Sequence, residues 1–359
     1  MNSMSTLIRD EIQEMSAYTV ADIPDSCIKL DAMELPCRFP EDMQKELACA
    51  LAVAEINRYP NPVTSGLQQL LKETFQIPEQ AQIVLGNGSD ELIQLITMLL
   101  AKPNAKILSV DPSFVMYRRN AVLFGLEYIG VPLNDDFTLN LPAILSAIKT
   151  HQPALIFIAY PNNPTGVPFR HEDVREIIDA APGVIVIDEA YGSFSLDSFL
   201  PYAGNVEKLV VMRTLSKIGF AGLRLGYACG HPILMNELAK IVPPYNMNQL
   251  SLTAAKFALR HYHYGWVEEQ INILKRERSR LSEALSLLPE VKVFASEANF
   301  LTIRVPDAEL VFKALKDSNI LIKNLHGSHP LLDQCLRLTV GTFEQNQQVL
   351  TVFQHLFNK

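Results

Sequence analysis

The chain has 359 residues, a length typical of about two domains. Hydrophobic residues make up 48% of it and charged residues 19%, which is the composition of a folded globular protein and excludes a disordered chain. The formal net charge of -8 argues against binding to nucleic acid or to an anionic membrane surface, so we expect neither as a partner. An anionic ligand would need a local group of arginines and lysines.

The cysteines and the first residues indicate a cytoplasmic protein. The five cysteines form no Cys-x-x-Cys pair and have no histidines at zinc-finger spacing, so we expect free thiols and no metal site. The segment Met1–Glu14 carries acidic side chains without an apolar core, which is not the pattern of a signal peptide. No apolar run reaches the roughly 18 residues that a membrane span needs.

Residues 1–40 hold two short patterned pieces separated by turns, and they are too few to form a core of their own. We expect an N-terminal arm that packs on the small domain or on a neighbouring subunit. A helical pattern begins at Glu41 and ends before the loop Asn57–Pro62, whose two prolines fix an extended conformation. Tyr59 stands on this loop, and a surface aromatic is the simpler interpretation of it from the pattern alone.

A strand, a glycine turn and a helix follow. Gln82–Leu85 has strand character, Gly86-Asn87-Gly88 forms the turn, and a helix runs from Ser89 to Leu100. Ser89 suits an N-cap, and Asp90 suits the first helical turn. Glycines that lead into a helix N-terminus can bind an anion, although an ordinary strand-to-helix connection explains the pattern too.

From residue 106 to residue 190, strands rich in valine and isoleucine alternate with helices of about ten residues. This alternation predicts an α/β fold with a mostly parallel sheet covered by helices on both faces. In such sheets, ligands bind at the carboxyl ends of the strands. Asn163 follows one strand, Asp188 ends the next and Lys217 follows a third, so we expect these three side chains to share one site.

The last third of the chain has a different order of elements. A long amphipathic helix covers Trp266–Leu288, and short strands then mix with two further helices. This order predicts a separate, smaller α+β domain. We therefore expect an arm over residues 1–40, a large domain over 41–255 and a small C-terminal domain over 256–359.

The most informative stretch surrounds Lys217. The apolar run Leu209–Met212 predicts a buried strand, and a lysine after a buried strand is costly unless its charge is used or its pKa is lowered. Thr214 and Ser216 before it and Arg224 after it can form an anion site. A lysine beside an anion site suggests a Schiff base to a phosphorylated aldehyde, pyridoxal phosphate. A solvated lysine at a strand end explains this stretch equally well when it is taken alone.

Such a cofactor needs further groups, and the chain offers each of them. A carboxylate must keep the pyridine nitrogen protonated, and Asp188 follows the apolar strand Val184–Ile187. Asn163 and Tyr191 can donate to the phenolic oxygen of the ring, and Phe114 can cover one ring face. The candidate ligands of the phosphate are Ser89 and Asp90 at a helix start, Thr214, Ser216 and Arg224.

Three motifs resemble the fold-type-I pyridoxal-phosphate aminotransferases: Pro161–Gly166 (PNNPTG), Asp188–Tyr191 (DEAY) and Ser216–Tyr227 (SKIGFAGLRLGY). Five further segments resemble the histidinol-phosphate aminotransferase family within that group: Lys29–Pro36 (KLDAMELP), Asn57–Pro60 (NRYP), Gly86–Leu92 (GNGSDEL), Ile322–His326 (IKNLH) and Cys335–Thr342 (CLRLTVGT). The resemblance covers nearly the whole chain. It departs at Met33 and Leu35, where many members have asparagine, and at Lys323, where many have arginine.

The resemblance implies a homodimer with the active sites at its interface. Tyr59 then reaches the phosphate of the cofactor in the neighbouring subunit. Arg337 holds the anionic end of the substrate, and Tyr18 of the arm lies near that substrate. Lys323 offers a second positive charge at the same end, without the bidentate geometry of arginine.

The resemblance also implies transamination between histidinol phosphate and 2-oxoglutarate in histidine biosynthesis. The substrates are then an amino phosphate and a 2-oxo acid, and Lys217, Asp188 and Tyr191 are the catalytic residues. An aromatic-amino-acid aminotransferase and an amino-acid-phosphate decarboxylase need the same cofactor groups and stay open as alternatives. A non-catalytic pyridoxal-binding regulatory module is the alternative from another class, and the short arm and acidic charge argue against its DNA-binding segment.

Overall fold

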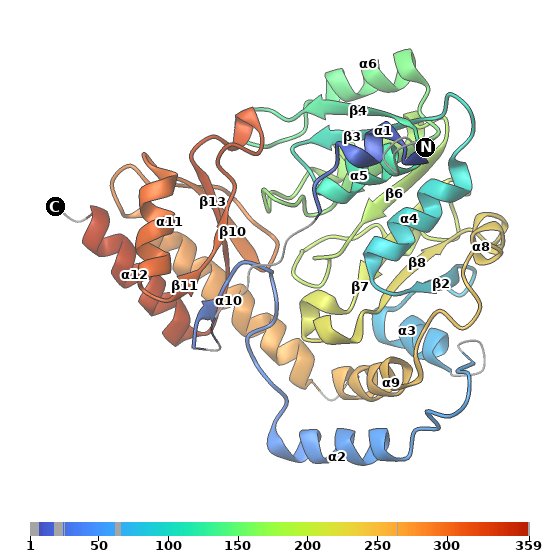
Figure 1. Ribbon diagram of the computed structural model, residues 1–359, viewed down its shortest axis with the longest axis horizontal. Helices are drawn as coiled ribbons and strands as arrows, with labels where there is room; N and C mark the ends of the chain where they lie inside the picture. The colour runs from blue at the N-terminus through green and yellow to red at the C-terminus, as the bar shows by residue number, and fades with distance from the viewer. Residues whose placement is uncertain (1–6, 18–23, 25, 62–65, 264, 358–359) are drawn as a thin grey trace.

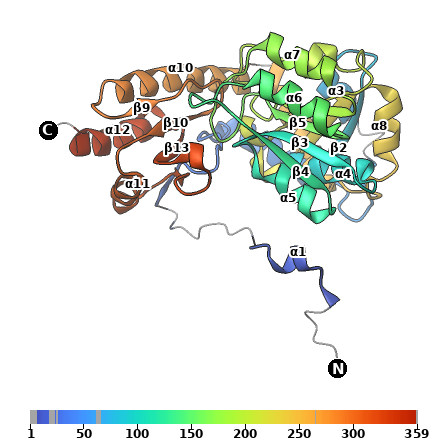
Figure 2. The same cartoon turned by 90° about the horizontal axis from the view of Figure 1, so that it is seen from above.

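The computed structural model describes residues 7–17, 24, 26–61, 66–263 and 265–357. A large domain is built on a central sheet and a smaller domain on a second sheet (Figure 1), and the short helix α1 (Asp10–Gln13) projects from the body of the molecule (Figure 2). Among the described residues, no helix combines the length and the apolar character needed to cross a membrane.

The central sheet has seven strands within the described part of the chain, in the order β2-β8-β7-β6-β5-β3-β4. Their bounds are Gln82–Gly86, Gly226–Gly230, Leu209–Thr214, Val184–Asp188, Leu155–Ala159, Lys106–Asp111 and Glu127–Pro132 in that order. The five strands from β7 to β4 are parallel neighbours, whereas β8 is antiparallel to both β7 and β2. Strand β8 can be antiparallel because it follows β7 without a crossover helix. The predicted mostly parallel sheet is confirmed.

Helices cover both faces of this sheet (Figure 2). One face is covered by α4 (Ser89–Leu100), α5 (Val115–Leu123) and α8 (Pro232–Ala239), and the other by α3 (Leu67–Phe75), α6 (Leu141–His151), α7 (His171–Ala180) and α9 (Gln249–His263). Side chains of β6 alternate between these faces, with Ile185 and Ile187 in one hydrophobic cluster and Val186 in the other. Asp188 continues the alternation, so its side chain lies on the face that α5 covers.

The small domain is built on an antiparallel sheet with the strand order β12-β13-β10-β9. Its strands span Lys323–Asn324, Cys335–Thr339, Phe300–Arg304 and Lys292–Val293 in that order, and its helices are α10 (Trp266–Ser286), α11 (Ala308–Asp317) and α12 (Phe343–Phe357). The sequence did not predict β12, because two residues are too few for a strand pattern. This short strand sets Lys323 opposite Arg337.

Helix α10 contributes to the cores of both domains. Val267, Ile271 and Leu274 pack in the cluster of the central sheet, and Leu281 and Leu285 pack in the cluster of the small domain. Helix α9 packs on α3 and on α2 (Glu41–Ala52), so it lies with the large domain. The division at residue 255 stays a prediction, and the change from one core to the other falls within α10.

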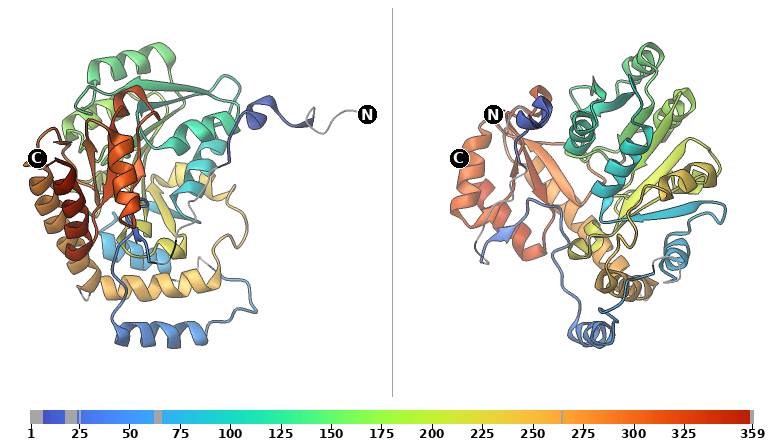
Figure 3. Two further views of the ribbon diagram at one scale, coloured as in Figure 1. Left: turned by 60° about the vertical axis from the view of Figure 1, so that its left-hand side comes forward. Right: turned by 45° about the vertical axis from the view of Figure 1, so that its right-hand side comes forward.

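The N-terminal arm contacts both domains. Its strand β1 (Ile28–Lys29) pairs in parallel with β11 (Ile320–Leu321) of the small domain. Farther upstream, Arg9 Nη2 donates a hydrogen bond to the carbonyl oxygen of Leu123 at the end of α5. Helix α2 then lies away from the central sheet, along α9 (Figure 3).

One local prediction was wrong. Ser89 was expected to cap α4, but it is the first helical residue, and Gly88 occupies the cap position with φ 82°. The carboxylate of Glu91 accepts a hydrogen bond from the backbone N–H of Asn87 instead, at 2.7 Å. The Ser89 hydroxyl therefore does not cap the helix, and Ser89 lines the pocket described below.

Candidate active site

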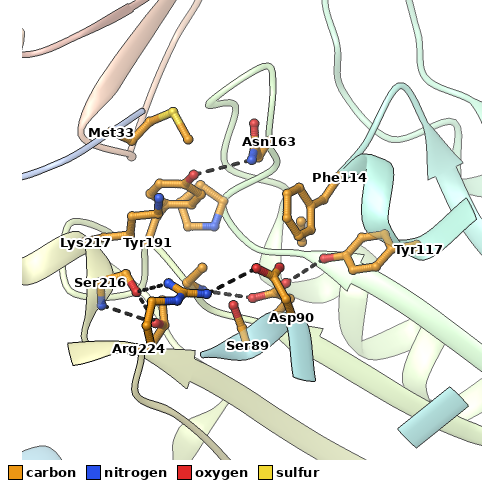
Figure 4. Close-up of a pocket in the computed structure, with 15 residues that line it drawn as sticks. Met33, Ser89, Asp90, Phe114, Tyr117, Asn163, Tyr191, Ser216, Lys217 and Arg224 are labelled. Carbon is orange, nitrogen blue, oxygen red and sulfur yellow. Dashed lines mark hydrogen bonds and ion pairs between the residues drawn. The ribbon is translucent and has the colours of Figure 1, made fainter. Parts of the chain in front are cut away.

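A pocket lies at the carboxyl ends of the parallel strands and encloses about 560 Å³, open solvent at its entrance included. Its lining comes from at least five separate segments of the large domain and from one residue of the arm (Figure 4). The lining residues are Met33, Ser89, Asp90, Phe114, Tyr117, Ala159, Pro161, Asn163, Asp188, Ala190, Tyr191, Thr214, Ser216, Lys217 and Arg224. The three side chains predicted to share a site from three strand ends are thus brought together.

Asp188 is buried at the end of β6 and accepts two hydrogen bonds. Tyr117 Oη donates to its Oδ2 at 2.7 Å, and the backbone N–H of Ala190 donates to its Oδ1 at 3.1 Å. Burial raises the pKa of Asp188 to about 6, although both hydrogen bonds oppose this rise. A nearby cationic group would keep the carboxylate charged, so Asp188 suits a protonated ring nitrogen.

Lys217 reaches the pocket from a short 3-10 turn, Ser216–Ile218, directly after β7. Its Nζ donates a hydrogen bond to the carbonyl oxygen of Ala32 at 3.1 Å and lies 5.8 Å from the centre of the Tyr191 ring. Burial, with the positive charge of Arg337 as a second cause, lowers the pKa of Lys217 to about 8. An amine with this pKa is available in its neutral, nucleophilic form near neutral pH.

Asn163 joins the large domain to the small one. Its Nδ2 donates to Tyr191 Oη at 3.3 Å, and its Oδ1 accepts a hydrogen bond from Arg337 Nη1 at 2.6 Å. Arg337 stands on β13 and is only 8% exposed. The guanidinium also lies 5.3 Å from the centre of the Phe300 ring, which packs edge-on against Tyr191. Arg337 is therefore held at the side of the pocket that faces the small domain.

Hydroxyl groups and an arginine gather at the opposite end of the pocket (Figure 4). Thr214 Oγ1 donates to Ser216 Oγ at 2.9 Å, and Arg224 Nη1 donates to the same Ser216 oxygen at 3.5 Å. Arg224 Nη2 also pairs with Asp90 at 3.4 Å. These donors lie around the N-terminus of α4, whose first N–H groups favour an anion.

At the Arg224 end of the pocket, the backbone at Gly88 leaves room for a close approach of the guanidinium. A Cβ atom at Gly88 would lie 2.6 Å from Arg224 Nη2, so the guanidinium occupies space that only glycine leaves free. Gly88 also has φ 82°, which favours glycine. The resulting cradle, together with the buried Asp188 and with Lys217 in the pocket lining, fits a phosphorylated pyridine aldehyde.

Three predicted site residues of the described part of the chain do not line the pocket: Arg337, Tyr59 and Lys323. Tyr59 is 80% exposed and stacks on Tyr245, with ring centres 4.6 Å apart. Lys323 is exposed on β12, directly opposite Arg337, and residues in that register project from the same face of a sheet. Tyr18 lies outside the described residues.

Sequence reasoning missed Tyr117 as a partner of Asp188. Tyr117 is fully buried, and its ring stacks on Phe157 with centres 4.6 Å apart. The available signal was its place three residues after Phe114, because residues three apart lie on one side of a helix. A tyrosine at such a position is more often a core residue, so the signal is weak.

A buried ion pair beside the site was also missed. Arg213 donates from Nε and Nη2 to Glu189 Oε2, at 2.9 and 2.6 Å. Glu189 follows β6, and Arg213 lies near the end of β7, at neighbouring positions of the two parallel strands. The pair therefore joins the strand ends that carry Asp188 and Lys217.

The fold and this set of groups are those of the pyridoxal-phosphate-dependent transferases of fold type I. The profile of the family "Aminotransferase class I and II" matches residues 26–353. A histidinol-phosphate aminotransferase of Neisseria meningitidis serogroup B is 57% identical over 99% of this chain and 98% of its own. That of Chromobacterium violaceum is 53% identical over 99% of both chains.

A solved structure has the same fold. The histidinol-phosphate aminotransferase from Sinorhizobium meliloti, in complex with pyridoxal-5'-phosphate, matches with a TM-score of 0.85 over 99% of this chain and 100% of its own, at 22% identity. The chain belongs to the class I and II aminotransferase family, in its histidinol-phosphate aminotransferase branch.

Proposed function

We propose that this protein transfers the amino group of histidinol phosphate to 2-oxoglutarate, forming imidazole acetol phosphate and glutamate in histidine biosynthesis. The observation that carries the proposal is the pocket around Lys217 in a chain 57% identical, over its whole length, to a histidinol-phosphate aminotransferase. Asp188 lies in the same pocket, and so does the hydroxyl and arginine group at its far end.

Pyridoxal phosphate, when bound, supplies an aldehyde for the substrate amine and a ring that takes up electrons from the α-carbon. Lys217 would hold the aldehyde carbon, and Asp188 would pair with the ring nitrogen. Asn163 and Tyr191 would donate to the phenolic oxygen, and Phe114 would cover a ring face. The position of these five side chains in one pocket supports the assignment.

The phosphate of the cofactor would be held at the other end of the pocket. Thr214, Ser216 and Arg224 offer hydroxyl and guanidinium donors there, and Ser89 and Asp90 offer the first N–H groups of α4. The ion pair of Asp90 with Arg224 supports this role by orienting the guanidinium. An anion at this position gains both hydrogen bonds and the favourable end of the helix dipole.

Lys217 also acts on the substrate. Its neutral amine would accept the proton of the substrate α-carbon and would later return one. A pKa of about 8 keeps the donor and acceptor forms close in free energy at neutral pH. Tyr191 supports this step because its ring lies beside Nζ.

The small domain supplies the charge for the anionic ends of both substrates. Arg337 is the residue we assign to the phosphate of the amino donor and to a carboxylate of the 2-oxo acid. Lys323 adds a second positive charge from the position opposite Arg337 on the neighbouring strand. Because Lys323 is exposed to solvent, we expect its charge to contribute less to substrate binding than that of Arg337.

The protein works as a cytoplasmic homodimer in this proposal. Val53, Ile56 and Tyr59 are 75 to 80% exposed, and such apolar side chains favour burial against a partner. Tyr59 would reach the phosphate of the neighbouring subunit's cofactor from this surface.

A comparison of rates tests the function. The purified protein should have a higher kcat/KM for histidinol phosphate than for phenylalanine or tyrosine with 2-oxoglutarate as acceptor, and it should release no carbon dioxide. Higher kcat/KM for the aromatic amino acids would favour the aromatic aminotransferase, and carbon dioxide release would favour the decarboxylase. Lys217→Ala should lose both turnover and the visible absorbance band of the bound cofactor.

A further inference from the structure

The segment Asp31–Met33, which we call the strap, connects the arm to two cationic residues of the site. The carbonyl oxygen of Asp31 accepts a hydrogen bond from Arg337 Nη2 at 2.9 Å. The carbonyl oxygen of the next residue, Ala32, accepts one from Lys217 Nζ at 3.1 Å. The strap therefore runs between the residue that meets the substrate amine and the residue assigned to its anionic end.

The backbone of Met33 is fixed by the small domain. Its N–H donates to Thr339 Oγ1, and its carbonyl oxygen accepts from Asn299 Nδ2, both at 3.0 Å. Met33 has φ 54°, in the left-handed region that residues other than glycine enter only at a cost in free energy. The two buried partners hold it in this conformation, which sets the direction of its side chain.

The side chain of Met33 lines the pocket and is 7% exposed. It packs in a small apolar cluster with Tyr191 and Phe300. Figure 4 shows it beside Tyr191 and Asn163, away from the Arg224 end that would hold the cofactor phosphate. Met33 therefore lies where the substrate, and not the cofactor phosphate, would be bound.

We propose that Met33 is a specificity-determining residue whose side chain forms an apolar wall against the ring of the substrate, so that this wall recognises the ring by contact and not by a hydrogen bond. The proposal rests on the proposed function and adds how the ring is selected. A substrate with its amine at Lys217 and its anion toward Arg337 lies along the strap, and its ring is joined through one methylene group to the carbon that carries the amine.

The chemistry of a thioether suits this role. Methionine is flexible and polarizable, and its sulfur makes favourable contacts with aromatic rings. It offers no hydrogen-bond donor, so a polar edge of a ring that faces Met33 loses water without gaining a strong partner. The asparagine that many family members carry at this position could bond to an imidazole nitrogen, whereas Met33 cannot distinguish imidazole from phenyl in this way.

The test compares two amine-free alkyl phosphates that differ only in their ring, one imidazole and one phenyl. Their dissociation constants for the holoenzyme are measured by calorimetry, so the readout does not depend on turnover. Met33→Asn should weaken the phenyl ligand about tenfold, the effect of a lost apolar contact. It should change the imidazole ligand by less than about threefold, because a new hydrogen bond offsets the loss. Asparagine tolerates φ above zero, so this variant is expected to fold.

Two control variants separate recognition from folding. Met33→Leu keeps the wall apolar and should keep the ratio of the two dissociation constants. Leu35→Asn places the same polar group two residues along the chain. Leu35 packs against Gly219 and the hydrophobic cluster of the central sheet. This variant should therefore lower the melting temperature without changing the ratio of the two dissociation constants. An unchanged ratio in Met33→Asn, or the same change in Leu35→Asn, would overturn the proposal. Failure of the proposed function is distinct, because the unmodified enzyme would then not turn over histidinol phosphate.

Discussion

Arg337 of the small domain donates a hydrogen bond from Nη1 to Oδ1 of Asn163 in the large domain, at 2.6 Å. Asn163 donates in turn to Tyr191, and Arg337 Nη2 donates to the carbonyl oxygen of Asp31. A short, charge-assisted bond in a buried place is among the stronger hydrogen bonds of a protein. The cation assigned to the substrate and the amide assigned to the cofactor are therefore held by one network across both domains.

Arg337→Lys should lower kcat/KM by roughly a hundredfold for both histidinol phosphate and 2-oxoglutarate. Lysine keeps the charge, but its single ammonium group cannot reproduce the planar geometry that reaches Asn163 and Asp31 together. Steady-state kinetics with each substrate measure the effect. Lys323→Gln is the comparison, and its exposed side chain should give a loss of less than about tenfold. Near-normal kcat/KM in Arg337→Lys would contradict the role assigned to Arg337.

Tyr117→Phe should make cofactor binding more sensitive to acid. In the proposed role, Asp188 pairs with the ring nitrogen of the cofactor in its ionised form. Burial raises the pKa of this carboxyl to about 6, so cofactor affinity should fall as the pH decreases below about 6. The Tyr117 hydrogen bond lowers that pKa. Its removal should raise the pKa of Asp188, so that the loss of affinity begins at a higher pH, and it should weaken binding by about tenfold near pH 7.

The measurement is a fluorescence titration of the cofactor-free protein with pyridoxal phosphate between pH 5 and pH 8, with roughly half-unit steps chosen to resolve one ionisation. Both proteins are titrated in the same buffers, so ionisation of the cofactor itself cancels in the comparison. Parallel profiles for the two proteins, differing only by a constant factor, would show that Tyr117 does not set the ionisation of Asp188.

The rate of cofactor capture should report the titration of Lys217. Only the neutral amine attacks the aldehyde, and burial, with Arg337 as a second cause, lowers the pKa of Lys217 to about 8. The second-order rate of absorbance change, measured by stopped flow, should rise about tenfold per pH unit below pH 8 and level off above it. Arg337→Gln removes a positive charge, so it should raise the pKa of Lys217 and shift the profile to higher pH. A profile in the unmodified protein that still rises past pH 10 would contradict this account.

The sequence was sufficient to predict the site residues at the strand ends, but it was insufficient to predict the side chains that contact them. Asn163, Asp188 and Lys217 could be predicted because each follows a short apolar strand, and parallel strands end at one edge of a sheet. The alternation of these strands with helices also predicted that helices cover both faces of the sheet. The antiparallel direction of β8 could not be predicted, because an apolar run does not indicate the direction of its strand in a sheet.

Partners that come from distant segments could not be predicted in the same way. Tyr117 and Asp188 are 71 residues apart, and their contact depends on how α5 packs on the central sheet. Met33 and Thr339 are 306 residues apart, and their bond depends on the position of the arm against the small domain. No local pattern encodes such pairings, since each half has an ordinary interpretation as core or loop.

The last prediction concerns assembly. Tyr59 lies outside the lining of the Lys217 pocket of its own chain. The residue is 80% exposed, and its ring stacks on that of Tyr245. If Tyr59 completes the neighbour's site, a dimer of one Lys217→Ala subunit and one Tyr59→Ala subunit carries both lesions in one site and leaves the other intact. Random exchange makes half of the dimers mixed, with one of two sites intact, so activity should return to about a quarter of the unmodified level. The measurement is turnover after subunit exchange, with dimers verified by size-exclusion chromatography. Unmixed variants subjected to the same exchange give the baseline, and a mixture that stays at this baseline would mean that Tyr59 does not act across the interface.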